Sequence, residues 1–63
     1  MNMKLFQIPR KSKVYCSASD GSEYVVFEKI DGMYSLCVTE KGAIVHLGAS
    51  TDLEKHQDGY KLS

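Results

Sequence analysis

Hydrophobic and polar residues alternate in short runs along most of the chain, which is the period of half-buried β-strands. The longest such segment is residues 24–38, YVVFEKIDGMYSLCV, where two apolar runs flank Asp31 and Gly32. An aspartate–glycine pair between alternating runs is typical of a two-residue β-hairpin turn. The segment therefore predicts a hairpin with Asp31 and Gly32 as its central turn residues.

The expected turn fixes the pairing of the two strands, because every residue of one then has a defined partner on the other. Phe27 would lie opposite Leu36, on a face that we expect to be the core. That face would hold Val25, Phe27, Tyr34, Leu36 and Val38, with Lys29 at its outer end. The second face would hold Tyr24, Val26, Ile30, Met33 and Cys37, interrupted by Glu28, Ser35 and Thr39. A solvated sheet face is mainly polar, so this second face predicts a further contact that covers it.

The remaining segments predict further strands and one short helix. Residues 4–8 end at a proline and indicate an edge strand or an extended arm, within an N-terminal segment 1–11. Strands are expected at residues 12–16, 43–47 and 60–62, a loop at 17–22, and a turn at 39–42 with Gly42 in the left-handed region. Thr51 and Glu54 have the spacing of a capping box, which predicts a helix of about two turns ended by Asp58-Gly59.

This order of elements resembles an SH3-like small barrel over residues 12–62. In such a barrel five short strands curl into two orthogonal sheets, and a short helical turn precedes the last strand. The resemblance rests on element order alone and carries no functional residues with it. The expected fold is therefore a single all-β domain, 1–63, built as a five-stranded SH3-like barrel.

Length and composition are those of one small folded domain. The chain has 63 residues, of which 43% are hydrophobic and 25% charged, so a disordered chain is not expected. No apolar run approaches the 20 or so residues that cross a bilayer, and no apolar segment of a secretory signal follows the N-terminus. We therefore expect a cytoplasmic protein in which Cys16 and Cys37 are reduced, with a single disulfide between them as the alternative.

Metal binding and catalysis both lack a motif. Cys16, Cys37, His46 and His56 supply four potential zinc ligands, but they are 21, 9 and 10 positions apart. Zinc sites usually present their ligands in close pairs, so we expect no metal and no other cofactor. The serines gather in loops, and 63 residues leave little room for a substrate pocket of several hundred Å³. We therefore expect neither an enzyme nor a small-molecule binder.

Charge is balanced overall but unevenly distributed. Residues 1–14 carry four basic side chains and no acid, whereas residues 15–63 carry four lysines and eight acids, a local net charge of −4. The basic side chains, with a nearby aromatic residue, are Lys4, Arg10, Lys11, Lys13 and Tyr15. Small barrels bind nucleic acid by stacking bases on aromatic rings beside lysines, which makes this segment an alternative binding site.

The preferred hypothesis is a binding module for another protein. The expected interface is the second face of the hairpin: Tyr24, Val26, Ile30, Met33 and Cys37. Contiguous exposed apolar surface usually marks an interface, and tyrosine and methionine are enriched there. The partner is either a different protein, with this chain as a small accessory or inhibitory binder, or a second copy of the chain.

Overall fold

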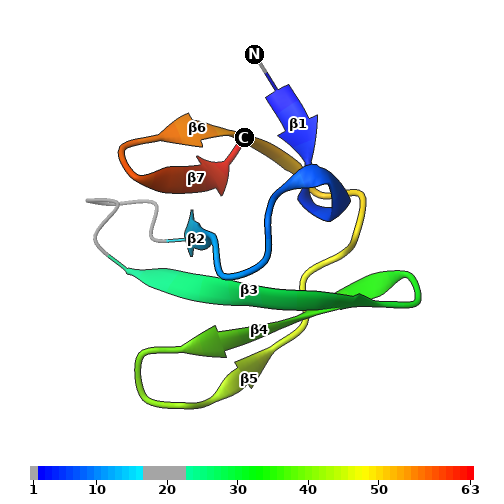
Figure 1. The fold of residues 1–63 in the computed structure, drawn as a ribbon, viewed down its shortest axis with the longest axis vertical. Coiled ribbons are helices and arrows are strands. Elements are labelled where there is room, and N and C mark those ends of the chain that lie inside the picture. The colour runs from blue at the N-terminus through cyan, green and yellow to red at the C-terminus, as the bar shows by residue number, and fades with distance from the viewer. Residues whose placement is uncertain (1, 17–22) are drawn as a thin grey trace.

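The computed structural model describes residues 2–16 and 23–63, and they form one mixed β-sheet (Figure 1). Its seven strands are β1 (Asn2–Lys4), β2 (Lys13–Tyr15), β3 (Tyr24–Asp31), β4 (Tyr34–Thr39), β5 (Ile44–Val45), β6 (Asp52–His56) and β7 (Gly59–Leu62). Their order across the sheet is β1-β6-β7-β2-β3-β4-β5. Strands β2 and β7 pair in parallel, and the other neighbours are antiparallel.

The all-β class is confirmed, but the five-stranded SH3-like barrel is not. The described strands form an open sheet with β1 and β5 at its edges. Residues 46–51 carry the chain from β5 to β6 along the side of the sheet (Figure 1). This segment is hydrogen-bonded to β4 and to the residue that follows β1, because Ser35 N donates to Leu47 O (2.7 Å) and Leu5 N donates to Thr51 O (3.0 Å).

The hairpin of β3 and β4 is confirmed, but its turn lies one residue later than predicted. Asp31 pairs with Tyr34, so Gly32 and Met33 are the central turn residues. Gly32 has φ +68°, and a glycine at the first central position is what a type II′ turn requires. A bulge between Phe27 and Lys29 then shifts the register again, which places Phe27 opposite Cys37.

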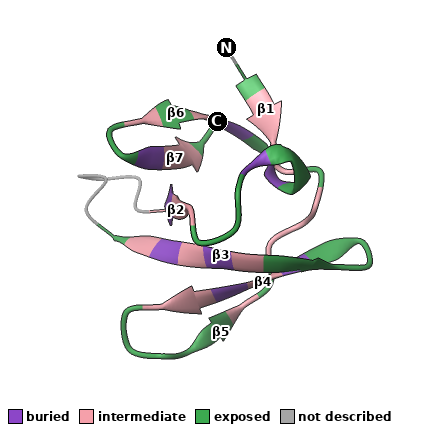
Figure 2. Ribbon diagram, in the orientation of Figure 1, coloured by how far each residue is buried: buried purple, intermediate pink, exposed green. Residues whose placement is uncertain are grey.

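The shifted register keeps the predicted inner face of β3 but reverses that of β4. Val25 and Phe27 are buried as predicted, whereas Ser35 and Cys37, each 0% exposed, are the buried residues of β4. Tyr34, Leu36 and Val38 were predicted to be core residues and instead point to the opposite face. The prediction was wrong for these three, because a one-residue shift of register turns every side chain of a strand over. Figure 2 shows this alternation of buried and less buried residues along β3.

The predicted helix after Thr51 is also wrong, because residues 52–56 form strand β6. This strand pairs with β1 on one side and with β7 on the other, and Leu53 is fully buried between them. Two ladders of hydrogen bonds outweigh a capping box that could start only two helical turns. Gln57 and Asp58 make the turn into β7, with Gln57 in the left-handed region at φ +50°.

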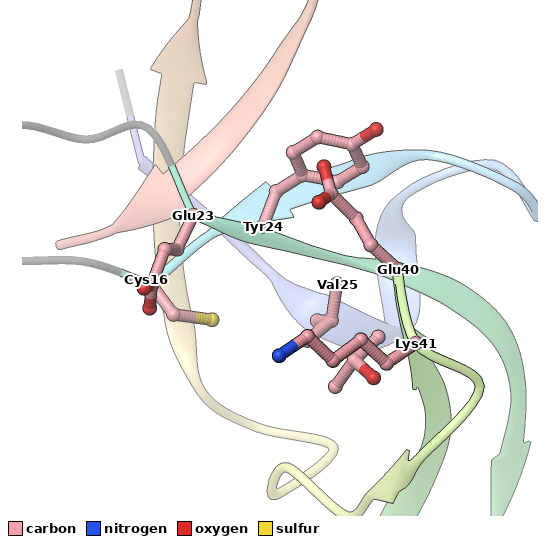
Figure 3. A pocket seen from close by; sticks show the side chains of 7 residues that line it. Cys16, Glu23, Tyr24, Val25, Glu40 and Lys41 are labelled. Atoms are coloured by element: carbon pink, nitrogen blue, oxygen red, sulfur yellow. The ribbon is translucent and has the colours of Figure 1, made fainter.

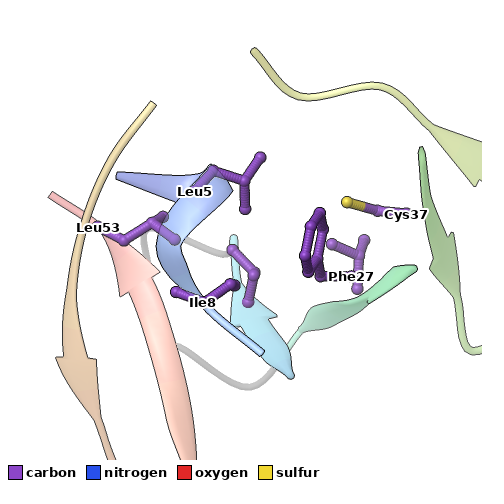
Figure 4. Close-up of a cluster of buried hydrophobic side chains, with 7 residues drawn as sticks. Leu5, Ile8, Phe27, Cys37 and Leu53 are labelled. Atoms are coloured by element: carbon purple, nitrogen blue, oxygen red, sulfur yellow. The ribbon is translucent and has the colours of Figure 1, made fainter. Parts of the chain in front are cut away.

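The N-terminal segment is an edge strand joined to a 3₁₀ turn. Asn2–Lys4 pairs with β6, and the turn η1 (Leu5–Gln7) follows in place of a longer strand. Leu5 and Ile8 then contribute to the core (Figure 4), whose buried members are Leu5, Ile8, Val14, Val25, Phe27, Cys37 and Leu53. The segment therefore covers the inner face of the sheet.

Three other predicted features are confirmed, and one lies outside the described residues. The strands expected at 12–16 and 60–62 are β2 and β7. In the turn after β4, Gly42 has φ +86° and its amide donates to Thr39 O (3.0 Å). The loop expected at 17–22 lies in the part of the chain that the structure does not describe.

Candidate functional site

The face of β3, β4 and β5 turned away from the core is apolar, and we call it the outer face. Its apolar side chains are Val26, Tyr34, Leu36, Val38 and Ile44. Val26 pairs with Val38, and Val38 pairs with Ile44, so three adjacent strands place aliphatic side chains in one row. Ile44 is 58% exposed and Tyr34 59% exposed, so both ends of the outer face are open to solvent.

The structure divides the five predicted interface residues among three environments. Tyr24 and Val26 lie half-buried on the predicted side of the sheet. Ile30 and Met33 are exposed at the end of the hairpin, Met33 by 83%. Cys37 is fully buried, so its side chain contributes nothing to the outer face. Sequence reasoning missed Tyr34, Leu36 and Val38, because it assigned them to the core.

Both charged residues at the hairpin end lie on the outer face. Lys29 pairs with Leu36 and Asp31 with Tyr34, and each pair points away from the core side of Ser35 and Cys37. Lys29 and Asp31 are exposed. Neither takes part in an ion pair within residues 2–16 and 23–63.

The basic N-terminal residues are largely engaged with the rest of the protein. Lys4 Nζ lies 2.5 Å from Asp52 Oδ1, Lys11 Nζ 2.5 Å from Glu28 Oε1, and Lys13 Nζ 3.0 Å from Asp58 Oδ2. Arg10 Nε donates to the backbone oxygen of Glu28 (2.9 Å). Each of these contacts would have to break before the side chain could bind a phosphate. The structure therefore supports the alternative nucleic-acid site less than the sequence does.

Tyr15, the aromatic member of that alternative site, is 8% exposed and belongs to a polar network. Its hydroxyl donates to Asp58 Oδ1 (2.7 Å), and its ring lies 5.5 Å from the Tyr24 ring and 5.0 Å from the His56 ring. The hydrogen bonds from Tyr15 and Lys13 lower the pKa of Asp58, while the bonds to Asp58 raise the pKa values of Lys13 and Tyr15. A ring held in this way has no free face on which a base could stack.

Cys16 and Cys37 are free thiols with raised pKa values. Burial is the main cause for both, because it disfavours the thiolate. His46 Nδ1 lies 2.9 Å from Ser35 O, whereas His56 packs on Tyr15 with its Nε2 buried and unpartnered among the described atoms. Within residues 2–16 and 23–63, no three cysteine, histidine or carboxylate side chains converge as metal ligands would.

A surface pocket of about 470 Å³ opens between the start of β3 and the β4–β5 turn. Its lining includes Cys16, Glu23, Tyr24, Val25, Thr39, Glu40 and Lys41 (Figure 3). The pocket is larger than the length of the chain led us to expect. Cys16 and Glu23 border residues 17–22, which lie outside the described structure, so we assign no ligand to this pocket.

Comparison with known proteins finds no matching family model, no matching curated protein and no matching solved structure. In the described residues, no helix has the length and apolar character needed to cross a membrane.

Proposed function

We propose that this protein is a non-catalytic binding module that recognises a protein partner through the outer face. The observation that carries the proposal is the aliphatic row Val26, Val38 and Ile44, which spans three adjacent strands and ends in a side chain that is 58% exposed. A sheet face left in water is mainly polar, and contiguous exposed apolar side chains are typical of an interface.

The state of the two thiols supports a non-catalytic role. Cys16 and Cys37 are the strongest nucleophiles of the chain when ionised, but burial raises the pKa of each. At neutral pH both stay protonated, which is the unreactive form. A cytoplasmic setting belongs to the same proposal, because thiols remain reduced there. So does an SH3-like curl of the sheet, supported by the bonds that join Leu5 to Thr51 and Phe6 to Ala49.

Substitution of Ile44 tests the proposal. The chain is immobilised and exposed to a nuclease-treated extract of its source cells, as wild type, as Ile44→Asp and as Leu62→Asp. Leu62 is the matched control, an apolar side chain that is 40% exposed but lies on β7, away from the outer face. A carboxylate at Ile44 would have to be buried in the interface without a partner, so its binding should be lost.

The expected result is a protein that is retained by the wild type and by Leu62→Asp but not by Ile44→Asp. Its retention should change little between about 50 and 200 mM salt, because apolar burial is not screened. Retention that Ile44→Asp leaves unchanged would overturn the proposal. So would retention that falls steeply with salt, since that is the behaviour of phosphate contacts.

A further inference from the structure

We propose that the outer face at the hairpin end binds a second copy of this chain about a two-fold axis. The axis lies in the interface and crosses β3 and β4 between the pair Lys29–Leu36 and the pair Asp31–Tyr34. This inference rests on the proposed function, because it names the partner for part of the same surface.

Four side chains form a square at this end of the outer face. Lys29 and Asp31 occupy one edge of the square on β3, and Leu36 and Tyr34 lie opposite them on β4. All four point away from the core, because the intervening Ser35 and the adjacent Cys37 are fully buried. The square therefore has a charged edge with one lysine and one aspartate, and an apolar edge with one leucine and one tyrosine.

This arrangement is self-complementary under a two-fold rotation. In a symmetric dimer the same patch meets itself, so each residue must suit its counterpart in the other copy. An axis across the strands reverses their direction but keeps β3 over β3 and β4 over β4. Lys29 then faces Asp31 of the second copy, and Leu36 faces Tyr34 of the second copy. Both contacts are favourable, and symmetry makes each of them twice.

The two charges at the hairpin end, like Glu40 and Lys41, form no ion pair within residues 2–16 and 23–63, whereas four other lysines do. Lys4, Lys11, Lys13 and Lys61 each pair with a carboxylate at 2.5–3.2 Å, whereas Lys29 and Asp31 pair with nothing in residues 2–16 and 23–63. They lie on the same strand two residues apart, with opposite signs. A uniformly acidic or basic partner would be repelled by one of them, while a second copy satisfies both.

The exposed methionine of the turn fits the same arrangement. Met33 is 83% exposed, at a turn position where a small or polar residue is common. In the two-fold overlay each Met33 lies beyond the square of its own chain, over the outer face of the second copy between Leu36 and Val38. Methionine adapts well to irregular apolar surface, so the dimer gives this side chain a partner. The overlap is short, and the expected dimer is accordingly weak, in the micromolar range.

Charge reversal at the two positions tests the geometry directly. Lys29→Asp places two aspartates where the lysine–aspartate contacts would be, and Asp31→Lys places two lysines there. Each variant alone should dimerise on the order of a hundredfold more weakly than the wild type. An equimolar mixture of the two should recover the dimer as a heterodimer, because every aspartate of one chain then faces a lysine of the other. Sedimentation velocity from about 1 to 500 μM covers the relevant range of affinities.

Glu40→Lys and Lys41→Asp are the matched controls. Both residues are exposed at the opposite end of the hairpin, and the variants have the same net charges as the test pair. Each control alone should dimerise like the wild type. Circular dichroism checks the fold of every variant, and Lys29→Glu or Asp31→Arg replaces one that is unfolded.

Three results would overturn the inference: a wild type that stays monomeric throughout, single variants that dimerise like the wild type, or a mixture that does not associate. The proposed function fails separately, when Ile44→Asp retains the same protein as Leu62→Asp. If the wild type stays monomeric but retains another protein that Ile44→Asp does not retain, the second copy is excluded as the partner. The proposed binding module would then still stand.

Discussion

Replacement of Gly59 by alanine tests the pairing of β2 with β7, which joins the two halves of the sheet, β1-β6-β7 and β2-β3-β4-β5. A Cβ at position 59 would lie 2.5 Å from the carbonyl oxygen of Lys13 and 2.9 Å from its Cβ. Gly59 does not have a positive φ, so alanine could adopt its backbone conformation without strain. The expected effect is therefore steric, and β7 has to move away from β2.

The magnitude follows from what the movement disturbs. Overpacking a well-packed site costs about 1–3 kcal/mol, and backbone atoms cannot swing aside as the end of a side chain can. The parallel pairs Val14–Tyr60 and Tyr15–Lys61 lie directly beside the contact. We therefore expect a loss near the upper end, about 3 kcal/mol, or a fall of roughly 12–24 °C in Tm. A domain this small has only a few kcal/mol of stability, so much of the variant should be unfolded at room temperature.

Urea denaturation followed by circular dichroism measures the effect, with Gly48→Ala as the control. A Cβ at Gly48 would meet nothing closer than Thr51 Oγ1 at 3.4 Å, which is an ordinary contact. Gly48→Ala should therefore be neutral or slightly stabilising. Equal stability of the two variants would refute the reasoning, because it would mean that β7 does not approach β2 this closely.

Three further substitutions test separate parts of the fold. Phe27→Ala empties a core site that is 3% exposed and should cost about 3–5 kcal/mol in thermal or urea unfolding; a barely destabilised protein would contradict the assigned core. The lowered pKa of Asp58 stabilises the fold above the pKa of the unfolded carboxyl, and this contribution is lost as pH falls through the folded pKa. Asp58→Asn should accordingly show a shallower acid decline in the urea midpoint than the wild type, and an identical decline would argue against the bonds from Tyr15 and Lys13. Gln57→Asn should raise stability by up to about 1 kcal/mol, since asparagine tolerates the left-handed φ of +50°; an unchanged Tm would count against that turn geometry.

The hairpin illustrates how far the sequence alone could go. The alternation of Val25 and Phe27 with polar or outward residues was enough to predict β3 and its inner face. The turn could not be placed from the sequence, because Gly32 suits both a type I′ turn with Asp31 and a type II′ turn with Met33. Moving the turn by one residue leaves Tyr34 and Leu36 on the same face as Lys29, so it is the bulge between Phe27 and Lys29 that reversed the predicted faces of β4.

The interior of β4 was mispredicted for a second physical reason. Hydrophobicity alone placed Tyr34, Leu36 and Val38 inside, but the chain between β5 and β6 passes close to β4 there. Ser35 fills that narrow space, and its hydroxyl donates to Leu47 O (2.9 Å). A buried serine with its hydrogen bond satisfied costs little, so a polar residue is tolerated in the core at this position. Tyr34, Leu36 and Val38 therefore lie on the outer face.

Contacts between distant parts of the sequence account for the remaining differences. Residues 52–56 have a local helix signal, yet they pair with β1 and β7, neither of which a local pattern can reveal. The basic N-terminal segment looked unpaired for the same reason. Lys4 and Asp52 are 48 positions apart, and Lys13 and Asp58 are 45 apart, so these ion pairs appear only in the folded chain.

Thiol labelling under native conditions tests the hairpin register, on which the outer face and both proposals depend. In a Cys16→Ser chain, the remaining Cys37 is 0% exposed and should react on the order of a hundredfold more slowly than in urea, because it becomes accessible only when the protein opens. In a chain with both native cysteines replaced by serine, Tyr34→Cys should react about as fast as in urea, since Tyr34 is 59% exposed. Fast labelling at position 37 together with protection at position 34 would mean that β4 turns its other face to the core, without the register shift between Phe27 and Lys29, and would contradict the account.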